Sequence, residues 1–174
     1  MNENPKSESP VHPIAFGERF AGSETFKVLF REGMALVEET ASYLDGDGRS
    51  DSKRLTRAGS LSYATESMRL TTRLMQLASW LLLQRAVSEG EMTLDQARSE
   101  KAKVRIKGFD TPTEGPAWEA LPEHLRSLIA RSLRLQERIA KLDTAIYRAP
   151  APPVADNPVG RQLGWLSEAF EGRK

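Results

Sequence analysis

The feature that most constrains the fold is one long helical pattern, which extends from about Ser52 to Ser88. Its apolar and small residues recur in alternating steps of three and four, the 3.5-residue period of a helical bundle or coiled coil. We expect this stripe to face the core; it comprises Ala58, Leu61, Thr65, Met68, Thr72, Met75, Ser79, Leu82 and Ala86. A second stripe on the same helix comprises Leu70, Leu74, Leu77 and Leu81. A helix this apolar must be covered on several sides, by two helices of the chain or by a second subunit.

Two further helices are predicted on either side of this one. The first runs from Glu24 to Leu44 behind a Ser23 cap, and its apolar residues recur at helical spacing: Phe26, Phe30, Val37, Ala41 and Leu44. Asp45-Gly46-Asp47-Gly48 ends this helix because glycine and aspartate favour turns. The last runs from Pro122 to Tyr147 with one apolar stripe, made of Leu125, Leu128, Ser132, Leu135, Ile139, Leu142 and Ile146. The sequence therefore predicts an all-α, three-helix bundle with a long central helix.

The chain divides into three regions. Residues 1–22 are predicted to be a disordered arm, whose first part, Met1 to Pro13, is polar and bears prolines, and residues 23–147 form the bundle. Residues 148–174 form a flexible tail that begins with a Pro-rich linker, because Pro150-Ala151-Pro152-Pro153 cannot be helical. The tail carries one apolar cluster of Leu163, Trp165, Leu166 and Phe170, which either binds a partner protein or folds back to cover the long helix.

Composition and charge exclude several classes of protein. The net charge is only +1, whereas a dedicated nucleic-acid binder would usually concentrate basic charge. The N-terminus lacks the basic and apolar segments of a signal peptide, and the apolar stretch near residue 80 is too short to cross a bilayer. We therefore expect a cytoplasmic protein.

No pattern in the chain supports catalysis. It has no cysteine, and its two histidines, His12 and His124, have no second histidine at helical spacing to share a metal ion. A calcium loop starting at Asp45 would need a glutamate where Thr56 stands. Because no phosphate-binding loop or nucleophile elbow is found, we expect neither an enzyme nor a bound metal or cofactor.

The candidate interaction residues lie on the long helix and in the tail. Glu66, Arg69 and Arg73 share one face, which is either a solvated face with an ion pair or, less favoured, a polar edge beside a docking groove. The stripe Leu70, Leu74, Leu77 and Leu81 is the surplus apolar face, for which a homodimer is the commonest solution. Trp165 and Phe170 are the candidate contacts of the tail.

Several stretches of the sequence resemble a known family. They are Phe30-Arg31-Glu32-Gly33-Met34, Tyr43-Leu44-Asp45-Gly46, the run YATESMRLTTRLMQLASWLLLQRAV from Tyr63 to Val87, Lys103-Val104-Arg105 and Leu121-Pro122. The stretch from Phe26 to Ile106, with the third helix, resembles the alphaproteobacterial RcdA family, the regulators of CtrA degradation.

The resemblance implies a dimeric three-helix bundle that acts as an adaptor for the ClpXP protease. It further implies that the response regulator CpdR primes the protease, which then recruits the RcdA-like adaptor. The adaptor would hold cargo such as cell-cycle transcription regulators, and PopA would dock on it to deliver CtrA. This role further implies concentration at a cell pole with the protease. The alternative is a helical, DNA-associated transcriptional regulator, which would need a helix-turn-helix pair and a basic recognition face.

Overall fold

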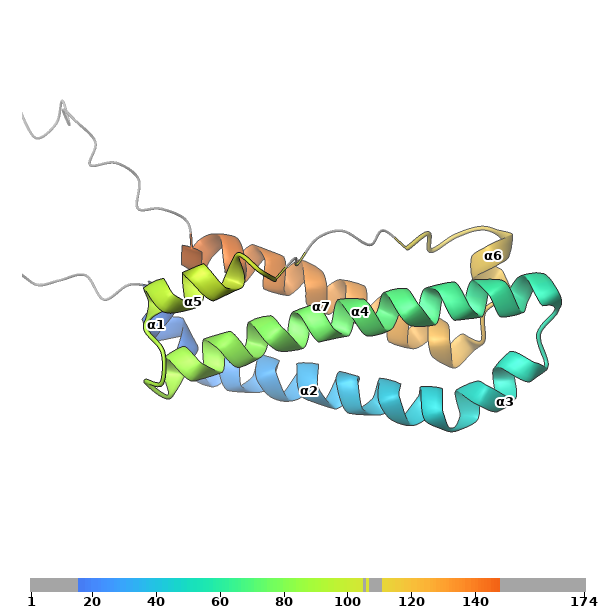
Figure 1. Ribbon diagram of the computed structural model, residues 1–174, viewed down its shortest axis with the longest axis horizontal. Helices are drawn as coiled ribbons and strands as arrows, with labels where there is room; N and C mark the ends of the chain where they lie inside the picture. Colours follow the sequence, from blue (N-terminus) through green and yellow to red (C-terminus); the bar gives the residue numbers. More distant parts are fainter. Residues whose placement is uncertain (1–15, 105, 107–110, 148–174) are drawn as a thin grey trace, which may run out of the picture.

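The computed structural model describes residues 16–104, 106 and 111–147 of the chain. These residues form α-helices and no strand: α1 (Phe16–Ala21), α2 (Glu24–Asp45), α3 (Asp47–Lys53), α4 (Arg57–Ser88), α5 (Leu94–Lys101), α6 (Pro116–Glu119) and α7 (Glu123–Tyr147). The long helices α2, α4 and α7 lie side by side, with α1 and α5 at one end and α3 and α6 at the other (Figure 1). The predicted all-α bundle with a long central helix is confirmed.

Helix α5 lies at one end of the bundle and α6 at the other, because α4 and α7 run in the same direction and α2 runs opposite to both (Figure 1). The described residues between α5 and α6 are called the returning segment. Gln136 of α7 donates a hydrogen bond to the Ile106 carbonyl, and Arg73 of α4 donates one of 2.8 Å to Thr111 Oγ1. Polar side chains of two long helices therefore bind the returning segment.

Helix boundaries follow the caps, with one correction. Ser23 caps α2 as predicted, its Oγ accepting from the Phe26 amide at 3.2 Å. The central helix, however, begins at Arg57 behind Thr56, because the short helix α3 precedes it. Gly48 of α3 is buried where a Cβ atom would lie only 2.8 Å from the Tyr43 carbonyl oxygen. Gly48, the second glycine of the predicted turn, therefore lets α3 lie close to α2 instead of forming an open loop.

Helix α1 falls within residues 1–22, which the sequence assigned to a disordered arm. Phe20 is 8% exposed and Ala21 is fully buried, and α1 contacts both α4 and α7. The Phe20 and Phe26 rings meet edge to face with centroids 5.7 Å apart. The packed region therefore begins before residue 23. Residues 1–15 and the predicted linker and tail, residues 148–174, lie outside the described residues.

The core is formed by one face of each long helix. On α7 the predicted stripe is confirmed, with only Leu142 half-buried; its buried members are Leu125, Leu128, Ser132, Leu135, Ile139 and Ile146. On α2 the buried side chains are Phe26, Leu29, Leu36, Thr40 and Tyr43, together with Gly33. The α2 core is therefore shifted from the predicted Phe30, Val37 and Leu44, which are half-buried, and Ala41, which is exposed.

The two stripes of α4 have exchanged the positions that the sequence predicted. The leucine stripe is the core: Leu70, Leu74, Leu77 and Leu81 are 0–4% exposed, and Trp80 beside them is fully buried. The heptad stripe instead faces outward: Leu61 and Met68 are each 71% exposed, Met75 66% and Leu82 52%. Met75 and Leu77 lie about 200° apart around a helix, so packing one against α2 and α7 exposes the other. The assignment of the heptad stripe to the core was wrong.

Candidate functional site: exposed surfaces of the bundle

Burial removes the leucine stripe from the surface of the folded monomer. Leu70, Leu74, Leu77 and Leu81 pack inside the core with α2 and α7, so they offer almost no area to a partner. The expectation that they form the surplus apolar face was wrong in this respect. The exposed apolar face is made instead by Leu61, Met68, Met75 and Leu82, which we call the outer α4 stripe.

The polar residues of α4 divide between the interior and the surface. Arg73 is 1% exposed, and its guanidinium donates to Ser132 Oγ at 3.0 Å and to Thr111 Oγ1 at 2.8 Å. Burial lowers the pKa of Arg73, and the nearby Glu66 carboxylate offsets part of that effect. Arg73 therefore joins α4, α7 and the returning segment, a role that its helical spacing could not reveal.

Glu66 and Arg69 form the predicted i, i+3 ion pair, with Arg69 Nη1 2.7 Å from Glu66 Oε1. Glu66 is buried, whereas Arg69 is half-exposed on the rim of a pocket of about 280 Å³ between α4 and α6. Trp118 and Leu61 form apolar walls of that pocket. Arg69 is thus the member of the predicted polar edge that can reach a partner. Trp165 and Phe170 lie outside the described residues.

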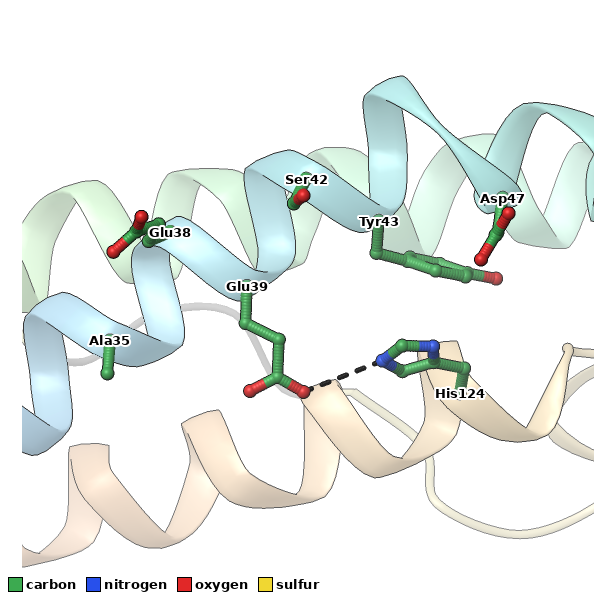
Figure 2. A pocket seen from close by; sticks show the side chains of 7 residues that line it. All are labelled: Ala35, Glu38, Glu39, Ser42, Tyr43, Asp47 and His124. Carbon is green, nitrogen blue, oxygen red and sulfur yellow. Dashed lines mark ion pairs between the residues drawn. The ribbon is translucent and has the colours of Figure 1, made fainter.

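A second polar cluster ties α7 to α2. Glu39 Oε1 accepts from Arg131 Nη1 at 2.7 Å and lies 3.5 Å from His124 Nε2 (Figure 2). The hydrogen bond from Arg131 holds the pKa of the Glu39 carboxyl below its ordinary value. The His124 ring packs on Tyr43 with centroids 4.4 Å apart, and Tyr43 donates to Asp51 Oδ2 at 3.0 Å. These contacts fix the helix pair.

The cleft beside this cluster has a volume of about 390 Å³ and is open to solvent (Figure 2). Its other lining residues include the carboxylates of Glu38 and Asp47. Within the described ranges, no group of three or more His, Asp or Glu side chains is placed to hold a metal ion.

An apolar groove lies between α2 and α4, and we call it the α2–α4 groove. Its volume is about 280 Å³, and it is lined by Val37, Thr40, Ala41, Leu44, Asp45, Thr71, Leu74, Met75 and Ala78. Sequence reasoning missed this groove because it depends on how two helices pack. The groove shares Met75 with the outer α4 stripe, which contains four of the five exposed large hydrophobic side chains of the described residues.

No helix of the described structure combines the length and apolar character needed to cross a membrane.

Comparison with known proteins identifies the family. Residues 17–170 match the family model described as "Protein of unknown function (DUF1465)". The chain is also similar to the crystal structure of RcdA from Caulobacter crescentus CB15, at 52% sequence identity and a TM-score of 0.63. That similarity covers 76% of this chain and 99% of the other. A comparison with curated proteins gave no match. Since the identity is high and the solved chain is covered almost completely, this chain belongs to the RcdA family.

Proposed function

We propose that this protein is a non-catalytic adaptor that links cell-cycle transcription regulators to the ClpXP protease for regulated degradation. The observation that carries the proposal is the 52% identity to RcdA across nearly all of its solved chain. By the same resemblance, we propose that CpdR primes the protease, that PopA docks on this protein, and that CtrA is among its cargo. We also propose that it works in the cytoplasm, at the pole where the protease concentrates.

The surface of the bundle supports a binding role. Monomeric proteins rarely expose a continuous apolar face unless a partner covers it. The outer α4 stripe exposes two leucines and two methionines along one helix, and methionine adapts its shape to different partners. Arg69, half-exposed beside Leu61, adds a charged group that can orient a bound protein. Because the long helices pack around one core, this surface is presented on a rigid frame.

A reconstituted degradation reaction tests the proposal. Purified ClpXP, CpdR, PopA and CtrA are mixed with ATP, with and without the full chain, and the half-life of CtrA is followed on gels. We expect the half-life to shorten only when the chain is present, and the chain itself to hydrolyse no ATP without the protease. An unchanged half-life for CtrA, and for every other protein captured by an inactive protease trap, would contradict the adaptor function.

A further inference from the structure

The α2–α4 groove has features of a binding site for an apolar helix. Its floor is formed by Leu74 and Thr40, which are 4% and 3% exposed, and its outer wall by Met75, which is 66% exposed. Thr40 Oγ1 is buried and has no hydrogen-bond partner among the described residues. Such a groove accepts apolar anchors spaced along one face of a helix.

The C-terminal tail of the same chain carries such anchors. Leu163, Leu166 and Phe170 stand at positions i, i+3 and i+7, which places them on one face of a helix. The match to the family model runs to residue 170 and so includes all three of them. A helix of the eight residues from Leu163 to Phe170 is about 12 Å long, and the groove extends over about 12 Å of α2 and about 10 Å of α4.

The end of the described chain lies within reach of the groove. Gln84 of α4 donates a 2.6 Å hydrogen bond to the Tyr147 hydroxyl, so the tail starts beside the C-terminal end of α4. Ala78, the first residue of the groove from that end, is about 9 Å from Gln84 along the helix axis. The sixteen residues from Arg148 to Leu163 span up to about 50 Å when extended. The linker is therefore long enough to pass around the bundle.

Charge complementarity sets a direction for the tail. Starting near Ala78 and running parallel to α2, it would finish at the end of the groove that contains Asp45. Arg173 and Lys174, which follow the apolar cluster, would then lie beside Asp45. The opposite direction would place the basic end of the tail away from this carboxylate.

We infer that the tail segment from Leu163 to Phe170 docks as a helix in the α2–α4 groove of its own chain, with Leu166 at its centre. The contact lies within one chain, so it is independent of the protease and of the proposed adaptor function.

Disulfide trapping in the full chain tests this contact, because the natural sequence has no cysteine. Ala41→Cys on the exposed wall of the groove is combined with Ala169→Cys in the tail. The matched control combines Ala35→Cys with Ala169→Cys: Ala35 is also an exposed alanine of α2, but it lines the acidic cleft (Figure 2). Mild oxidation is followed on non-reducing gels, with each double variant at low micromolar concentration.

We expect the Ala41 pair to form an intramolecular disulfide roughly tenfold faster than the Ala35 pair, because docking raises the local concentration of the tail thiol. Adding Leu166→Asp, which changes only the tail, should reduce the rate to that of the control. Equal rates for the two pairs would overturn the proposal. So would crosslinking found only between chains, which would assign the groove to the tail of a second copy.

Discussion

At the scale of single residues, substitutions at Met75 and Leu77 test which face of α4 packs in the core. Leu77 is 1% exposed and Met75 is 66% exposed. Leu77→Asp buries an unpaired carboxylate, so we expect a loss of several kcal/mol from a total stability of roughly 5–15. In the dilute monomer, Met75→Asp should lower the free energy of unfolding far less, because the carboxylate at this exposed position stays in water. Urea titrations of both variants make the comparison, and equal losses would show that Met75 is also in the core.

Glu39 gives a pH-dependent prediction at the same scale. The hydrogen bond from Arg131 lowers its pKa in the folded state below the ordinary value of 4.5, so the ionised carboxylate stabilises the fold at neutral pH. That contribution is lost as the pH falls below 4.5 and through the lower folded-state pKa. Because Glu39 is 39% exposed, we expect Glu39→Gln to cost less than about 1 kcal/mol at pH 7.

Urea midpoints measured from pH 7 to pH 3 provide the check for Glu39. The difference between Glu39→Gln and the parent should shrink steadily toward acid pH. Glu38→Gln is the control, since Glu38 is the exposed residue just before Glu39 on α2 and makes no ion pair within the described residues. A difference that grows toward acid pH would contradict the assignment.

At the scale of elements, Gly33 sets how closely α2 approaches its neighbours. A Cβ atom at this position would overlap Leu81 Cδ1 of α4 and lie 3.6 Å from Leu135 Cδ2 of α7. Valine forms helix better than glycine, so Gly33→Val would stabilise the protein if α2 were free of contacts here. We expect instead a loss of about 1–3 kcal/mol through overpacking, measured by urea unfolding. Ala35→Val, at an exposed position of the same helix, should stay near the parent.

The elements also show what the sequence could predict and why the rest was missed. The core face of α7 was predictable because its apolar residues form one stripe with charged residues elsewhere. Helix α4 has two apolar stripes at helical spacing, and only the positions of α2 and α7 decide which of them is buried. Likewise, the role of Arg73 depends on Ser132 and Thr111, which are distant in sequence. Periodicity within one helix contains no information about either arrangement.

At the scale of the whole molecule, the outer α4 stripe has the symmetry of a self-complementary contact. Leu61 and Leu82 lie equally far from the midpoint between Thr71 and Thr72, and so do Met68 and Met75. If two copies pair these helices antiparallel across a two-fold axis, leucine meets leucine and methionine meets methionine. Small residues between them (Thr65, Thr72 and Ser79) let the two helices approach closely. We therefore propose that the homodimer forms through this stripe rather than through the buried leucines.

Charge exchange tests both the dimer and its orientation. Leu61→Glu and Leu82→Lys are made separately, and each places two charges in the apolar contact of the dimer. We therefore expect both single variants to be monomers at tens of micromolar, a concentration at which even a weak dimer is populated. Across an antiparallel contact, each new glutamate of the double variant faces a new lysine of the other copy, so the dimer should return. A parallel contact would oppose like charges and stay dissociated. Sedimentation equilibrium distinguishes these outcomes, and a parent chain that is itself monomeric at this concentration would refute the homodimer.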